Sequence, residues 1–160
     1  MPGLRSGIPG MFFRDVKRGN NMGEVRANVR LRNFGDVATV AHGHRTEDQI
    51  PTSHLDCLVD TGAVMVLLPQ DEVEKLNLVD GDPVIVTYAD ERREERPIAR
   101  GLEVTACNRT MVTDCVVGPP LCEPLIGQLV LEALDLVVDC QHQRLGPRPE
   151  SPNRPLLKLK

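Results

Sequence analysis

The tetrapeptide Asp-Thr-Gly-Ala at residues 60–63 is the part of this 160-residue chain best suited to chemistry. It directly follows an apolar run at residues 57–59, so the Asp60 carboxylate is expected at a tight turn that ends a strand. Gly62 permits a backbone path that residues with a Cβ resist, and Thr61 offers a hydroxyl beside the carboxylate. Two such carboxylates facing each other would share one proton and activate a water, because like charges that close cannot both ionise. The tetrapeptide occurs once, so a carboxylate pair would require two chains.

Length and composition indicate a single folded domain with an aliphatic core. Hydrophobic residues make up 41% of the chain and charged residues 26%, but only three Phe and one Tyr are present. The net charge of −4 argues against a nucleic-acid-binding protein, which usually carries a basic patch. No apolar run approaches the ~20 residues that a membrane span needs, so neither nucleic acid nor membrane is an expected partner.

The cysteines and histidines favour a reduced protein without a metal. The five cysteines are odd in number, lie in apolar segments and form no C-x-x-C pair, so we interpret them as reduced core thiols. Because no signal-peptide pattern accompanies them, they predict a cytoplasmic protein. His42, His44 and His54 could bind a metal, but exposed loop histidines are the preferred interpretation, and no cofactor is expected. The cysteines are Cys57, Cys107, Cys115, Cys122 and Cys140.

The distribution of prolines, glycines and charges divides the chain into three segments. Residues 1–22, in which Gly, Asn and Arg are frequent, are expected to form a flexible N-terminal tail. Residues 146–160 are expected to form a C-terminal tail, because four prolines close together exclude regular structure. The leucines near its end could pair between subunits, although a frayed tail is the preferred interpretation. The folded domain is therefore predicted at residues 23–145.

Within this domain most patterns predict strands. Period-two alternation over residues 24–33 predicts a half-buried strand, and residues 37–41 are a candidate extension past a turn. Buried strands are predicted at 55–59 and 64–68, and a turn at 80–82. The pattern indicates a mainly β domain with two short helices. These helices are predicted at 70–76 and 128–134, and further strands at 83–88, 98–100, 102–107, 111–117 and 136–140.

A long hairpin with a charged tip is predicted near the middle of the chain. A run of charged residues at 90–96 separates the strand at 83–88 from its return strand. The run could bind a charged substrate, but a solvated hairpin tip is the default interpretation. Tyr88, at the base of the tip, could contact substrate or be an ordinary half-buried strand residue.

The order of these segments resembles that of the retropepsins, the single-lobed aspartic proteases of retroviruses and their bacterial relatives. A strand, Asp-Thr-Gly-Ala, an apolar strand, two hairpins, an apolar-apolar-Gly triplet and a helix follow one another over residues 24–145. The resemblance implies a single-lobe acid-protease fold, a closed β-barrel or sandwich, that is active as a homodimer.

The resemblance also assigns roles to individual positions. Asp60 matches the catalytic aspartate, and Thr61 matches the residue whose hydroxyl interlocks with its twin across the dimer. Gly62 matches the glycine whose carbonyl accepts a hydrogen bond from substrate, and Ala63 matches the small residue that lines the cleft. The strand that threads behind the active-site loop corresponds to Leu125, Ile126 and Gly127. Residues 88–97 match the flap, a mobile hairpin that closes over bound peptide, with Tyr88, Ala89, Asp90, Glu91, Arg92 and Arg93 as the candidate substrate contacts.

The chain departs from the viral pattern at the expected dimer interface and at the hairpin tip. Viral enzymes usually carry an Arg after the Gly of the second motif and an Asp shortly after the first, which form an ion pair near the interface. Here these positions are Gln128 and Val64, so the dimer is expected to be held differently. Viral flap tips are rich in glycine, whereas this tip is charged.

The sequence therefore predicts an aspartic endopeptidase in which the paired Asp60 carboxylates of a homodimer activate water against an extended peptide or unfolded protein. The alternative is a catalytically idle, dimeric peptide-binding or scaffold module on the same fold. A protease domain derived from a mobile element would have different biology but the same chemistry. The intact residues 60–62 favour an enzyme, because an unpaired buried charge is costly to keep.

Overall fold

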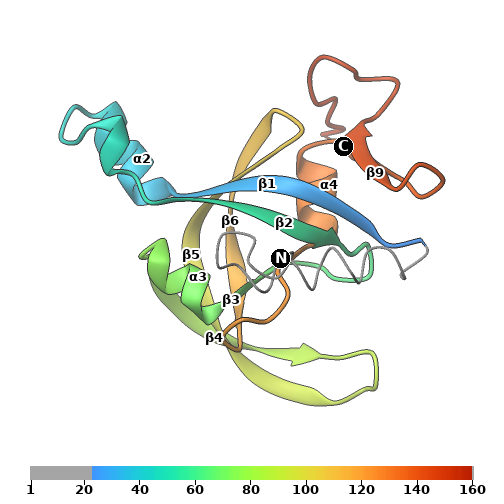
Figure 1. The fold of residues 1–160 in the computed structure, drawn as a ribbon, viewed down its shortest axis with the longest axis horizontal. Coiled ribbons are helices and arrows are strands. Elements are labelled where there is room, and N and C mark those ends of the chain that lie inside the picture. Colours follow the sequence, from blue (N-terminus) through green and yellow to red (C-terminus); the bar gives the residue numbers. More distant parts are fainter. Residues whose placement is uncertain (1–22, 160) are drawn as a thin grey trace, which may run out of the picture.

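The computed structural model describes residues 23–159, in which the fold is mainly β, as predicted (Figure 1). The strands are β1 (Val25–Asn33), β2 (Thr52–Val59), β3 (Val66–Pro69), β4 (Val79–Thr87), β5 (Arg93–Ala106), β6 (Arg109–Gly118), β7 (Leu125–Ile126), β8 (Leu136–Asp139) and β9 (Arg144–Pro147). The first seven form one sheet in the order β1-β2-β7-β3-β6-β5-β4. A further pairing between β1 and β5 closes six of these strands into a ring and leaves β4 as the outer strand.

The ring encloses an aliphatic core, as the scarcity of aromatic residues requires. On β1, Val25, Val29 and Leu31 are buried at the spacing that a strand with one inward face gives. Each large aliphatic side chain that is removed from water contributes about 1.5–3 kcal/mol to the free energy of unfolding. The largest fully buried side chains include Leu31, Leu68, Leu76, Leu102, Ile126 and Leu134.

The structure has a helix where a strand extension was a candidate. Residues 34–41 form α2 (Phe34–Ala41), which projects from one end of the β1–β2 pair and leads into a short 3-10 turn, η2 (Glu47–Gln49) (Figure 1). The Asn33 side chain starts the helix, because its Oδ1 accepts a hydrogen bond from the Asp36 N–H at 3.3 Å. The described residues thus contain three α-helices rather than two, the others being α3 (Gln70–Lys75) and α4 (Gln128–Ala133).

The predicted turn at residues 80–82 is wrong, because these residues lie inside β4. The strand pairs with β5 on both sides of a register shift between Gly81 and Val84. Likewise, the two strands predicted at 98–100 and 102–107 are parts of one strand, β5, which bends at Gly101, where φ is +80°. A glycine accommodates this left-handed backbone without strain.

The C-terminal prolines do not exclude regular structure as far as predicted, because Gly146 and Pro147 belong to β9, which pairs with β8. The chain beyond β9 is held by side chains of the domain instead of by a ladder. The Asp135 carboxylate accepts hydrogen bonds from Arg148, from the Ser151 hydroxyl and from the Leu156 N–H. The predicted tail at residues 1–22 lies outside the described residues.

The cysteines are only partly core residues. Cys57 and Cys115 are buried, and burial raises the pKa of the Cys115 thiol to about 12. Cys107 and Cys122 are half-buried, but Cys140 is exposed, so the prediction of a core thiol is wrong there. Cys140 lies in the turn after β8, and the apolar residues that precede it in the sequence do not cover this turn. Between residues 23 and 159 no helix is both long enough and apolar enough to span a membrane.

Candidate active site

Asp60 follows β2 directly and occupies a turn fixed by backbone hydrogen bonds. Its N–H donates to the Ile126 carbonyl at 3.0 Å, and its own carbonyl accepts from the Ala63 N–H at 3.2 Å. The carboxylate Oδ1 accepts the Gly62 N–H at 2.9 Å, which sets the direction of the side chain. Asp60 is half-buried, whereas Thr61 and Gly62 are exposed. The loop therefore presents a carboxylate at the surface in a defined orientation.

The triplet Leu125-Ile126-Gly127 passes behind this loop. Residues 125 and 126 form β7, which runs parallel to β2, pairing Val59 with Ile126, and antiparallel to β3. A Cβ on Gly127 would lie 2.6 Å from the Ala63 carbonyl oxygen and 2.8 Å from that of Met65. These are rigid backbone atoms, so the close approach requires glycine at this position. The structure thus brings the two sequence motifs into contact.

The start of α4 fixes the other side of the loop. The first N–H groups of a helix have no partner within the helix. Here the Gln128 N–H donates to the Ala63 carbonyl at 2.7 Å, and the Leu129 N–H donates to the Val64 carbonyl at 3.0 Å. Val64 itself was predicted to begin a buried strand, but its residue is 70% exposed and β3 begins two residues later. The Asp60 loop is therefore bonded to β7 and to α4 through main-chain atoms alone.

The hairpin of β4 and β5 is built differently. Its turn closes with the Tyr88 N–H donating to the Arg92 carbonyl at 2.9 Å, and residues 89–93 are exposed. The Tyr88 hydroxyl donates to Glu94 at 2.9 Å, and the Arg92 guanidinium stacks on the Tyr88 ring at 4.3 Å from its centroid. The hydrogen bond from Tyr88 and the nearby Arg96 lower the pKa of Glu94, and the same bond raises the pKa of Tyr88. The charged tip is thus solvated and paired within itself.

The predicted site residues fall into two groups in space. Residues 60–63 and 125–127 are in direct contact, whereas the hairpin residues 88–93 form a separate arm. In the view of Figure 1 this arm and the Asp60 loop extend toward the same side of the molecule. Sequence reasoning included Arg96 in the charged run and in the flap but did not single it out, although its guanidinium joins the arm to the end of β6. Nothing in its sequence context distinguishes it from the other charges of the run.

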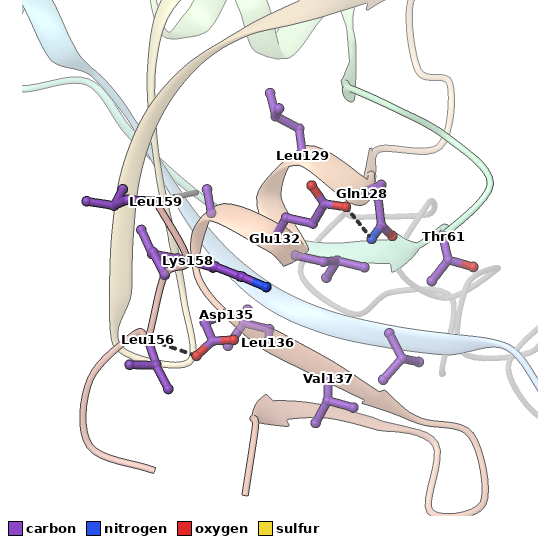
Figure 2. A pocket seen from close by; sticks show the side chains of 14 residues that line it. Thr61, Gln128, Leu129, Glu132, Asp135, Leu136, Val137, Leu156, Lys158 and Leu159 are labelled. Atoms are coloured by element: carbon purple, nitrogen blue, oxygen red, sulfur yellow. Dashed lines mark hydrogen bonds between the residues drawn. The ribbon is translucent and has the colours of Figure 1, made fainter. Parts of the chain in front are cut away.

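An open groove of about 730 Å³ adjoins the Asp60 loop at Thr61 (Figure 2). α4 forms one wall and the C-terminal residues 156–159 form another, with β8 between them. Several leucines around the groove are exposed, including Leu129 at 42%, Leu156 at 61% and Leu159 at 94%. In the sequence, the only indication of this groove wall was the leucine-rich C-terminus, which was interpreted preferentially as a frayed tail. A surface this apolar beside a candidate site is typical of an interaction face.

The residues described give no metal-binding cluster. Between residues 23 and 159 no group of three or more His, Cys, Asp or Glu side chains comes together. In particular, His42 and His44 follow α2, whereas His54 lies in β2.

The comparison with protein-family models finds no match for this chain, and the comparison with curated proteins finds no significant match. Function therefore has to be inferred from the residues of the site. One carboxylate at an exposed turn can polarise or deprotonate a bound group. A second carboxylate at the same place would add the complementary protonation state.

Proposed function

We propose that the protein is an aspartic endopeptidase of the retropepsin type, active as a homodimer in which each chain supplies one Asp60. The observation that carries the proposal is the contact of Gly127 with the carbonyls of the Asp60 loop. A turn aspartate with only a local role needs no strand behind it and no helix start beside it. Locking the loop by main-chain bonds gives the carboxylate the fixed position that paired catalysis requires.

In the proposed mechanism the two Asp60 side chains share one proton and titrate as a coupled pair. The ionised carboxylate takes a proton from a water, and the water oxygen attacks the scissile carbonyl carbon. The protonated carboxylate donates a hydrogen bond to the carbonyl oxygen as it becomes negatively charged. The peptide C–N bond then breaks, and the leaving nitrogen takes up the proton that the first carboxylate removed from the water. The reaction forms no covalent intermediate with the enzyme and calls for no cofactor.

The second copy is proposed to cover the face that contains the groove. Val64 and Leu129 are exposed on the residues bonded around the Asp60 loop, and Thr61 lies at the groove margin. Burying such side chains contributes about 25 cal/mol per Å² of apolar surface. The positions that carry an ion pair in viral enzymes, Val64 and Gln128 here, are neutral. Apolar burial would then take over the role of that pair.

Substrate is proposed to bind in an extended conformation between the Asp60 loops and the β4–β5 hairpin. The exposed hairpin would act as the flap, pairing with the peptide backbone as an added strand. Its length and exposure support this role: β4 and the first five residues of β5 contain no buried residue.

Peptide cleavage tests the proposal directly. A diverse mixture of unstructured peptides is incubated with the protein from pH 4 to 7, and the products are identified by mass spectrometry. Asp60→Asn serves as the test variant, and Asp48→Asn, an exposed carboxylate in η2, serves as the matched control. We expect cuts by the wild type and by Asp48→Asn, and none by Asp60→Asn. Cuts by Asp60→Asn would exclude this mechanism.

A catalytically idle peptide-binding dimer is the second candidate. It is favoured by the hydrogen bond from the Gly62 N–H to Asp60 Oδ1, because a carboxylate that caps its own turn has a structural role without chemistry. Peptide binding without cleavage, by a protein shown to be dimeric, would select this function over the endopeptidase.

A further inference from the structure

The hairpin of β4 and β5 has a break in its ladder near its base. Pairs are regular up to Gly81 with Ile98 and again from Val84 with Arg96, with a register shift between them. Pro83 and Pro97 lie at this break and carry no N–H with which to bridge it. Both prolines also line a hollow of about 530 Å³ at the same place. The outer part of the hairpin, residues 84–96, can therefore tilt without breaking ladder bonds.

The part of the hairpin below the break is fixed to the ring. Val79 and Asp80 pair with Arg100 and Ala99, and Ala99 pairs in turn with Cys115 of β6. Gly81 lies directly beneath the Arg100 side chain, since a Cβ there would lie 2.6 Å from Arg100 Nε. Tilting is thereby confined to residues beyond Gly81.

One side chain bridges the break from the outer part to the ring. Arg96 donates from Nε and Nη2 to the Val117 carbonyl at 3.0 and 2.8 Å, and from Nη1 to Glu94 at 3.1 Å. Its side chain is only 18% exposed, so these bonds are partly shielded from water. Glu94 also accepts the Tyr88 hydroxyl, which extends the chain of contacts to the tip.

The acceptor of these bonds belongs to the framework of the Asp60 site. The pairing of β6 with β5 ends at Val116, so Val117 lies just beyond that ladder. Val117 pairs with Leu68 of β3, and the neighbouring Leu67 pairs with Leu125, the residue that enters behind the Asp60 loop. The position of Val117 is thus tied by strand pairing to that of the catalytic loop.

We propose that Arg96 is a positioning residue that holds the outer hairpin in a fixed position relative to the Asp60 loop by its two bonds to Val117. The proposal rests on the function proposed above, because it assigns the hairpin to the substrate. A hairpin that is already held in one position loses less conformational freedom when peptide binds. Arg96 acts on peptide affinity and leaves the chemical step to Asp60.

The fork of Arg96 on one carbonyl distinguishes this role from a surface ion pair. A lysine in its place would keep the positive charge near Glu94 but cannot direct two N–H groups in a rigid plane. Surface ion pairs contribute little and are screened by salt, whereas the bonds to a neutral carbonyl do not depend on charge pairing. Arg96→Lys and Arg96→Ala therefore separate the two explanations.

The experiment compares Arg96→Ala and Arg96→Lys with Arg144→Ala, an exposed arginine on β9 that belongs neither to the hairpin nor to the Asp60 loop. Hydrogen exchange of residues 84–95 is measured together with kcat and KM for one peptide cut by the wild type. For Arg96→Ala we expect exchange and KM to rise about tenfold, with kcat within about twofold of wild type. Arg96→Lys should lie between Arg96→Ala and the wild type, and Arg144→Ala should match the wild type.

Unchanged exchange and KM in Arg96→Ala would overturn the proposal, as would an equal response of Arg144→Ala. Exchange that rises throughout the ring would also overturn it, because Arg96 would then support the fold in general. If the wild type cuts no peptide, the endopeptidase proposal fails separately. Faster exchange confined to residues 84–95 in Arg96→Ala would still support the role of Arg96 in holding the hairpin.

Discussion

The Asp60 loop and the β4–β5 hairpin are held by different kinds of contact. The loop is fixed by main-chain bonds to Ile126, Gln128 and Leu129 and by a glycine that no other residue can replace. The outer part of the hairpin is joined to the end of β6 by the Arg96 side chain, which also binds Glu94, and the base of the hairpin contains a break in the ladder. Main-chain bonds cannot rearrange without unfolding a strand or a helix end, whereas side chains can change partners. The molecule thus combines a loop fixed by main-chain bonds with a hairpin whose outer part is joined to the end of β6 by a side chain.

Gly127→Ala should disrupt the Asp60 loop, and its effect should be the largest of those predicted. The new Cβ would lie 2.6 Å from the Ala63 carbonyl oxygen, so the loop or β7 must move. We expect the free energy of unfolding, measured by urea denaturation, to fall by about 2–3 kcal/mol, and peptide cleavage to be lost. Gly146→Ala is the control, since a Cβ there meets no atom within 4 Å. Equal stability of the two variants would contradict the description of a locked loop.

The C-terminal segment is held by side chains, as the outer hairpin is, but here the side chains are buried. Arg109 is 7% exposed and donates to the carbonyls of Leu134, Asp135 and Ser151. Arg109→Lys should lower the free energy of unfolding by about 2 kcal/mol, because an ammonium cannot reach all three acceptors. Arg144→Lys, at a side chain that is 71% exposed, is the control in the same denaturation experiment. If Arg109→Lys leaves the free energy of unfolding almost unchanged, burial does not make these side-chain contacts rigid.

The smallest effect is expected from the pH dependence of the hairpin. Because the Tyr88 hydroxyl and Arg96 lower the pKa of Glu94 in the folded protein, its ionisation stabilises the hairpin above the unfolded pKa of about 4.3. That contribution is lost as pH falls through the lower, folded pKa. Carboxyl NMR should show Glu94 titrating below the ordinary glutamate pKa of about 4.3, and Tyr88→Phe should raise the pKa of Glu94. A Glu94 midpoint at the ordinary glutamate pKa would show that the contacts with Tyr88 and Arg96 are absent in solution.

The strand and loop elements around Asp60 could be predicted because local patterns decide them. The alternation of apolar and polar residues over 24–33 predicted β1, and the apolar run before Asp60 predicted the end of β2. The resemblance supplied the pairing of the loop with Leu125-Ile126-Gly127, which no local pattern contains. Residues 37–41, rich in β-branched and small side chains, fit a strand as well as a helix. A single cap at Asn33 decides between them.

The remaining differences arise from contacts between residues far apart in sequence. The turn-like sequence at 80–82 is drawn into β4 by pairing with β5, which overrides its local preference. The C-terminal prolines remove N–H donors, but Asp135 and Arg109 supply side-chain partners to the segment. Arg96 reaches Val117 across 21 positions of sequence. Such contacts depend on the finished fold, so a single sequence does not reveal them.

Closure of the ring has a consequence for self-association. With β1 joined to β5, the seven-stranded sheet exposes a long unpaired margin at β4, whose Val79 and Ile85 are 66% and 72% exposed. An unpaired edge strand of this kind can pair with the edge strand of another chain and so promote aggregation. Pro83, the register shift and the acidic residues at 80 and 82 interrupt it, and these are devices that block edge-to-edge growth. The same strand can therefore remain accessible to a short extended peptide while it resists edge-to-edge aggregation with further copies of the chain.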